Sequence, residues 1–249
     1  MERKIFLVIA LALIFSVSNA QAWGEVSHIG VMPQRMAETS KTQPFAGYED
    51  YFRAGAWCDD WFSLLWIEGH DWRCSHSKEF YNALNNLAAQ SGSREKQAWA
   101  AGFSFSAGAD AVWADWIIEE KMTGNAKESL FKYATDLYAK CDYGAKIPKF
   151  ISYPDLISKA YAQSCGEKID ESKIKTALKA LEKGTYTEYA SLNCRLKSLV
   201  PKQTKTAIEK RMKGKLDASV KDGMARVNAL AKTPSKKPVI LASASKTAA

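Results

Sequence analysis

The spacing of apolar residues predicts helices along most of the chain. In residues 78–90 apolar positions recur at intervals of three and four, the pattern of a helix with one buried face, and Gly92 ends the segment. Ser93 has a side chain suited to an N-cap, and it opens a second helix that ends near Gly124. Because strand signals are weak throughout, the sequence predicts an all-α fold. Further helices are expected over residues 125–141, 154–165, 171–183, 186–199 and 202–231.

The chain before Ser77 is less regular. Pro33 interrupts a segment over residues 26–36 that would otherwise form one short helix. Residues 51–76 are rich in Trp, Asp, Gly and Cys, and this composition predicts helix ends joined by a structured loop. Because binding and catalytic residues concentrate in such loops, a functional site is expected in this part of the chain.

The first 22 residues have the pattern of a secretory signal peptide. Arg3 and Lys4 precede an apolar run of eleven residues, 5–15, which is too short for a stable membrane anchor. Ala20-Gln21-Ala22 then supplies the small residues that a signal peptidase requires. The sequence therefore predicts a periplasmic or secreted protein that begins at Trp23, with an uncleaved membrane anchor as the alternative.

Charge divides the mature chain unevenly. Residues 23–194 carry 19 Lys and Arg against 23 Asp and Glu, whereas residues 195–249 carry 14 against 3. We expect a helical domain over 23–200, a basic helix over 201–231 and a disordered tail over 232–249. The basic end could contact an anionic membrane surface, or it could serve only to solubilise the chain. Nucleic acid is a less expected partner because no aromatic residues interleave with the lysines.

The five cysteines predict disulfides, because the signal peptide directs the chain to an oxidising compartment. Proximity in the sequence favours Cys58 with Cys74 and Cys141 with Cys165, which leaves Cys194 over. Other pairings remain open, since connectivity is not encoded in spacing alone.

The histidines are candidates for metal ligands. His28, His70 and His76 are the only three in the chain, and they lie within the stretch that is richest in Trp and Asp. The alternative is that they are ordinary structural residues. Cleavage before Trp23 adds a second donor, because its free α-amine, with a pKa of about 8, can chelate a metal together with the Trp23 carbonyl oxygen. His28 follows five residues later, close enough to fold back onto the same ion.

Asp110 is a further candidate, because it interrupts a helix of mostly apolar and small residues. A carboxylate that faces a core is costly unless it is paired or bound to a metal. Ser106 lies one turn earlier on the same helical face.

Four segments together resemble a known family. They are Trp23–His28, with the pattern Trp-Gly-x-x-x-His; Phe52–Trp61, in which Gly-Ala precedes Asp59 and Asp60; His76–Phe80, a His placed before a helix; and Gly102–Asp110. In this order they resemble the zinc-dependent phospholipase C and single-strand nuclease superfamily. The resemblance covers about residues 23–120.

The resemblance implies an all-helical, single multi-helix domain that holds up to three zinc ions and hydrolyses phosphodiester bonds. In such sites the ions activate water and stabilise charge on the phosphoryl oxygens. Two of the metal sites have counterparts in this chain. The implied ligands are Trp23, His28 and Asp110 for one zinc, and Asp60 (or Asp59), His76 and the bridging Asp110 for another.

This sequence also departs from the family pattern. Ser106 stands where the family has a histidine, and no histidine follows His76. Oxygen ligands such as Asp115, Glu119 or Asp155 could substitute, although no motif indicates them. His70 has no counterpart in the family and could serve as a hydrogen-bond donor to a ligand.

These observations predict an exported zinc phosphodiesterase, similar to phospholipase C, with a reduced site of one or two ions. Its substrates would be phosphoesters, lipid headgroups among them. The alternative from the same resemblance is a degenerate, non-catalytic member that acts as a metal-binding or structural helical protein. A third hypothesis is an unrelated helical binding protein.

Overall fold

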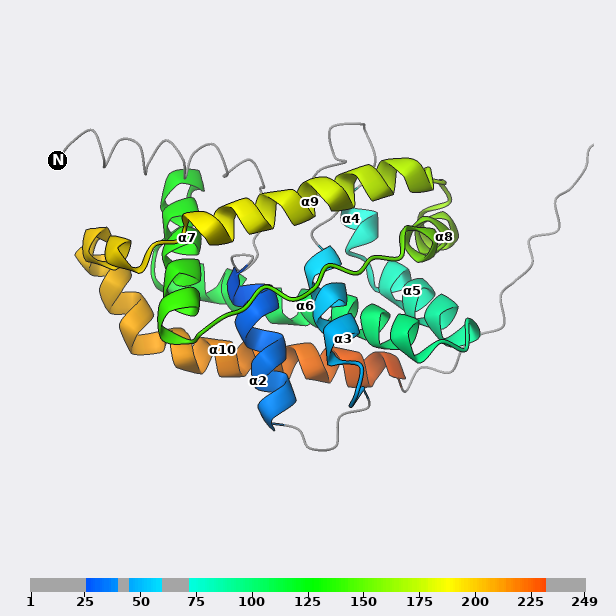
Figure 1. Cartoon of the computed structure of the whole chain (residues 1–249), viewed down its shortest axis with the longest axis horizontal. Helices are drawn as coiled ribbons and strands as arrows, with labels where there is room; N and C mark the ends of the chain where they lie inside the picture. The colour runs from blue at the N-terminus through cyan, green and yellow to red at the C-terminus, as the bar shows by residue number, and fades with distance from the viewer. Residues whose placement is uncertain (1–25, 40–44, 60–71, 232–249) are drawn as a thin grey trace, which may run out of the picture.

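The computed structural model describes residues 26–39, 45–59 and 72–231, and these form an all-α domain with no strand among them, as predicted. The helices α9 and α10 run along opposite long sides of the molecule, with α6 between them (Figure 1). The elements are η1 (Val26–Val31), α2 (Met32–Thr39), α3 (Glu49–Cys58), α4 (Trp72–Ser75), α5 (Lys78–Gln90), α6 (Arg94–Glu119), α7 (Asn125–Asp142), α8 (Pro154–Cys165), α9 (Glu171–Ser191), η4 (Cys194–Leu199) and α10 (Lys202–Ala231).

Local capping signals explain why several helix boundaries match the sequence prediction. The side chain of Ser77 accepts a hydrogen bond from the Phe80 amide at 3.1 Å and starts α5 at its expected residue. Ser93 does the same for α6, accepting from the Lys96 amide at 3.2 Å. Each bond satisfies an amide that the first turn of a helix leaves without an intrahelical partner.

The predicted break between helices at residues 183–186 is wrong. Helix α9 continues through Gly184 to Ser191, and only then does the short 3₁₀ helix η4 begin. Tertiary contacts outweigh the low helix propensity of glycine here. Thr185 is buried inside the helix, where its hydroxyl accepts a hydrogen bond from the indole of Trp57 at 3.0 Å.

Pro33 does not separate two helices. The chain passes from the π-helix η1 directly into α2 at Met32, and Pro33 is the second residue of α2. A proline in the first turn loses no intrahelical hydrogen bond, so the chain remains helical across it.

Helix α6 is the centre of the domain, and glycines allow other helices to approach it closely. A β-carbon added at Gly55 of α3 would overlap the backbone of α6, and one added at Gly102 of α6 would overlap the backbone of α3. Gly108 of α6 and Gly223 of α10 allow a second close crossing, between these two helices. The two crossings fix α3 and α10 against α6.

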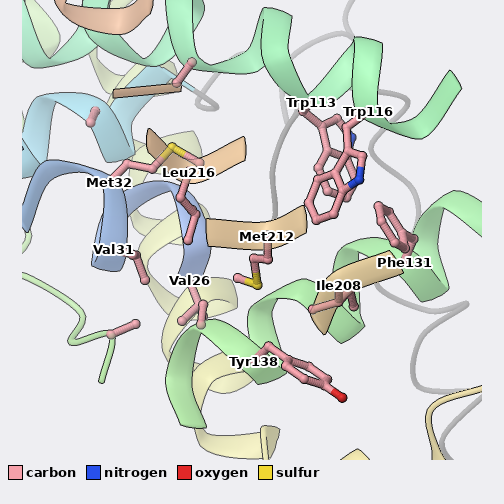
Figure 2. Packing of buried hydrophobic residues seen from close by; sticks show 14 of the residues in the cluster. Val26, Val31, Met32, Trp113, Trp116, Phe131, Tyr138, Ile208, Met212 and Leu216 are labelled. Carbon is pink, nitrogen blue, oxygen red and sulfur yellow. The ribbon is translucent and has the colours of Figure 1, made fainter. Parts of the chain in front are cut away.

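Two apolar clusters share α6. The first joins α6, α7, η1 and α10 (Figure 2), with the Trp116 and Phe131 rings 4.8 Å apart at their centres. The second lies toward α5 and α8 and is rich in aromatic side chains, which include Trp57, Phe80 and Trp99. Burial of side chains of this size, worth about 1.5–3 kcal/mol each, is the main stabilising term.

The predicted basic helix corresponds to α10, and it is part of the core. Ile208, Met212 and Leu216 are buried against the rest of the domain. Two of its basic side chains, Arg211 and Lys215, pair with Glu119 of α6 at 2.8 and 2.9 Å. Contact of the basic end with a membrane surface stays a prediction, and residues 232–249 lie outside the described residues. None of the described helices is both long and apolar enough to span a bilayer.

Two disulfides are present, but the pairings favoured by proximity are wrong. The bridges are Cys74–Cys165 and Cys141–Cys194, with Cα atoms 5.9 and 5.8 Å apart. Packing decides the pairing, because α4 lies on α8 and α7 lies on η4. Cys58 is in neither bridge and is buried, with its thiol 3.6 Å from the Ile151 carbonyl oxygen.

Candidate functional site

His28 and Asp110 meet inside the domain. His28 comes from η1 and is fully buried, whereas Asp110 comes from α6 and its side chain is 20% exposed. The Nε2 atom of His28 lies 3.7 Å from Oδ1 of Asp110. The resemblance implied that these two residues share a metal, and the fold brings them together although they lie 82 residues apart in the sequence. We call them the His28–Asp110 pair.

Ser106 makes the direct hydrogen bond to His28. Its hydroxyl oxygen lies 2.8 Å from Nε2 and 3.1 Å from the Ala56 carbonyl oxygen. A carbonyl can only accept, so the Ser106 proton is assigned to the Ala56 bond, and Nε2–H then donates to Ser106. This arrangement does not activate Ser106 as a nucleophile, because His28 does not take its proton.

The other ring nitrogen of His28 is unusual. Nδ1 is buried and has no hydrogen-bond partner among the described residues. A buried nitrogen left in this way costs about 1–3 kcal/mol if it carries a proton. Because the proton is assigned to Nε2, Nδ1 is a buried acceptor that could take a hydrogen bond from a further group.

A second carboxylate lies nearby. Asp59, at the end of α3, is 2% exposed and accepts hydrogen bonds from the Tyr81 hydroxyl at 3.1 and 3.4 Å. Of the two candidates left open by the sequence, Asp59 is therefore directed inward, and Asp60 lies outside the described residues. Burial raises the pKa of Tyr81 well above its ordinary value, and Asp59 raises it further while Arg226 lowers it. Tyr81 is thus a neutral hydrogen-bond donor.

The remaining predicted ligands do not join this group among the described residues. His76 is exposed, and its Nδ1 lies 2.9 Å from the hydroxyl of Ser75. In the described ranges no three His, Cys, Asp or Glu side chains form a group that could hold a metal. Trp23, Asp60 and His70 lie outside those ranges.

The proposed substitute oxygen ligands are engaged elsewhere. Asp115 is exposed, and Glu119 pairs with α10. Asp155 lies 3.4 Å from the ammonium of Lys96.

Comparisons of the chain with protein-family models, curated proteins and solved structures found no match. Support for a metal site therefore comes only from the side chains that could bind the ion. An imidazole nitrogen and a carboxylate oxygen are both zinc donors, and a zinc site has four ligands in tetrahedral geometry. The His28–Asp110 pair fits half of one such site, with the amine and carbonyl oxygen of Trp23 as the candidates for the rest. The second ion implied by the resemblance stays a prediction, because Asp60 lies outside the described residues and His76 is exposed.

Sequence reasoning missed another buried carboxylate, Asp136 of α7. It accepts hydrogen bonds from the amides of Val26 and Ser27 at 3.1 and 2.8 Å and from the Ser27 hydroxyl at 2.7 Å. Asp136 also shares a hydrogen bond with Glu188, whose pKa is raised to about 8 by burial and by the charge of Asp136. The sequence carried no clear signal for Asp136, because α7 also has charged residues such as Lys132 and Lys140.

Proposed function

We propose that this is an exported, phospholipase C-like helical protein that binds one zinc ion at the His28–Asp110 pair and hydrolyses phosphodiesters, with lipid headgroups the natural substrate class. The separation of 3.7 Å between Nε2 of His28 and Oδ1 of Asp110 is the observation that carries the proposal. Two donors at this distance suit ligands of a single ion, whose bonds to nitrogen and oxygen are each about 2.0–2.2 Å.

The anchoring of the chain next to His28 supports a role for the mature N-terminus. Asp136 holds the amides of Val26 and Ser27, and Trp23 precedes Val26 by three residues in the sequence. Removal of the signal peptide would then complete the site by freeing the Trp23 amine. When bound, zinc supplies Lewis acidity toward phosphoryl oxygens and water.

The chain's own residues have distinct tasks in this proposal. His28 and Asp110 hold the ion, and the Ser106 hydroxyl, 2.8 Å from Nε2, gives up that hydrogen bond when the ion binds. Tyr81 holds the carboxylate of Asp59 inside the domain, because its hydroxyl donates to both oxygens of Asp59.

A non-catalytic metal-binding protein is the second candidate. The exposure of His76 favours it, because the family's second metal would need a ligand at that position. Ser106 in place of a histidine favours it as well, since a hydroxyl is a poor zinc ligand.

Elemental analysis of correctly processed protein tests the proposal. We expect one zinc per chain in the wild type, less than a tenth of that in His28→Ala and Asp110→Asn, and an unchanged content in His76→Ala, the matched control. Zinc in wild-type amounts in His28→Ala would contradict the site. Hydrolysis of p-nitrophenylphosphorylcholine, lost together with zinc, would favour the enzyme, whereas zinc without turnover would favour the non-catalytic protein.

A further inference from the structure

Helix α10 is strongly basic, and only part of its charge is paired within the domain. It holds eight Lys and Arg against three Asp and Glu. Arg211 and Lys215 pair with Glu119 of α6. Lys205 pairs with Glu209, one turn further along the same helix, at 3.7 Å. The unpaired lysines that remain lie on the side of α10 that faces solvent.

Four of these lysines follow one another along the outer side of the helix, and we call them the α10 lysine row. All four are exposed, and none forms an ion pair with a carboxylate among the described residues. At 3.6 residues per turn, their spacing keeps them within an arc of about 100°, turned away from the buried Ile208 and Met212. With a rise of 1.5 Å per residue, the row is about 28 Å long. Its members are Lys202, Lys210, Lys213 and Lys221.

The carboxylates of α10 do not cancel this charge. Asp217 lies on the same side of the helix as the row, but it pairs with Arg35 of α2. Glu209 pairs with Lys205, and Asp222 points about 100° away from the last lysine of the row. The row therefore presents unbalanced positive charge to the solvent.

The surroundings of the row favour a lipid surface over nucleic acid. Nucleic-acid strands bind through their phosphates and by stacking on aromatic side chains, and α10 contains no aromatic residue. An anionic bilayer needs only cations within reach of its headgroups. Among the described residues the exposed large apolar side chains are Ile118, Tyr186 and Leu199, and none of them belongs to α10. Contact through this helix is therefore electrostatic, without insertion into the bilayer.

We propose that the α10 lysine row is a docking surface for an anionic lipid bilayer, with α10 lying flat on the headgroups. A lysine near such a surface strengthens binding about fivefold, so that four acting together would contribute several hundredfold. Residues 232–249, which follow α10 in the sequence, add four lysines and no acidic residue. The inference does not depend on the zinc site, because it uses none of the residues of that site.

Co-sedimentation of the processed protein with vesicles of phosphatidylglycerol and phosphatidylcholine tests the proposal. We expect the combined variant Lys210→Gln, Lys213→Gln and Lys221→Gln to weaken binding at least tenfold. Because the three side chains are exposed, their replacement should leave the fold intact. Binding of this variant within twofold of the wild type would overturn the proposal, as would a wild type that does not bind these vesicles.

Helix α9 supplies a matched control, because it runs along the opposite long side of the molecule (Figure 1) and also carries exposed lysines. The control variant loses the same charge and should bind within threefold of the wild type. Equal losses in the two variants would mean that net charge alone attracts the protein, and the docking surface would be refuted. The control substitutions are Lys175→Gln, Lys179→Gln and Lys183→Gln.

Three further measurements keep the result specific. Binding should disappear when NaCl is raised from about 0.05 M to about 0.5 M, and binding that persists would indicate apolar insertion instead. A variant with Lys232, Lys236 and Lys237 replaced by Gln should bind more tightly than the α10 variant, and the reverse order would assign the contact to residues 232–249. Tighter binding to a single-stranded oligonucleotide than to the vesicles at equal salt would overturn the assignment to lipid.

Discussion

Two buried polar centres lie on either side of η1, and they differ in how completely the protein satisfies them. At Asp136 every contact is made within the chain, with two amides and one hydroxyl donating to a single carboxylate. At the His28–Asp110 pair, Nδ1 of His28 is left without a partner among the described residues.

The difference separates a centre that is fully hydrogen-bonded within the chain from one that keeps an unpaired polar atom. A satisfied buried network stabilises a fold, whereas an unpaired buried polar atom needs a separate explanation. Residues 26 and 27 are held by the first centre, and His28, the next residue, belongs to the second. The Asp136 centre therefore positions the chain for the His28–Asp110 pair.

The largest effect is expected on replacing Asp136. Asp136→Ala leaves the buried amides of Val26 and Ser27 unpaired, and we expect the free energy of unfolding to fall by about 3 kcal/mol or more. Equilibrium urea denaturation at pH 7 measures this loss. The control is Asp142→Asn on the same helix as Asp136. Asp142 forms an ion pair with Lys197 at the surface, and its loss should cost less than about 1 kcal/mol. Equal losses would mean that other contacts hold the segment before His28.

The Asp136 centre also predicts a pH dependence. The pKa of Glu188 is raised to about 8 from an ordinary value of 4.5, mainly by burial, so the folded protein retains a proton that the unfolded chain releases. The stabilisation from this group is complete below pH 4.5 and is lost as the pH rises through 8. Between these values its contribution should fall by up to about 1.4 kcal/mol per pH unit.

Glu188→Gln isolates that contribution, because glutamine does not titrate. We expect the difference in unfolding free energy between wild type and variant to change steadily over this pH range. Parallel curves for the two proteins would show that Glu188 titrates normally.

Much of the helical layout could be predicted because its signals are local. Ser77 and Ser93 cap α5 and α6 within four residues of sequence, so the pattern alone located these helix starts. The course of α9 past Gly184 could not be predicted in this way, since it depends on Trp57, 128 residues from Thr185. The disulfides depend in the same manner on which helices pack together.

Part of the candidate site could be predicted, because a charged residue stands out in an otherwise apolar helical segment. A carboxylate in an apolar stretch identified Asp110, whereas the same criterion does not single out Asp136, because α7 carries several other charged residues. The contact of Arg226 with Tyr81 carried no such signal, because basic residues are frequent along α10. It follows from the crossing at Gly223, which only the packed structure reveals.

The smallest effect is expected at Ser106, and it tests whether Nε2 of His28 is the metal-binding atom. Ser106→Ala removes one hydrogen bond to His28 and one to Ala56, with a net loss of about 1 kcal/mol in stability. Ser104→Ala is a matched control, because Ser104 is equally buried on α6 but bonds Ala100 and Asn85 instead.

Both serine variants should lose similar stability, but only Ser106→Ala should gain zinc affinity. Zinc must displace the hydrogen bond between Ser106 and Nε2, so its removal should tighten binding by about two- to tenfold, the equivalent of roughly 1 kcal/mol. Competition with a chelating dye measures the change. If zinc binds the two variants equally, Ser106 does not compete for the metal, and the two polar centres differ in hydrogen bonding without differing in function.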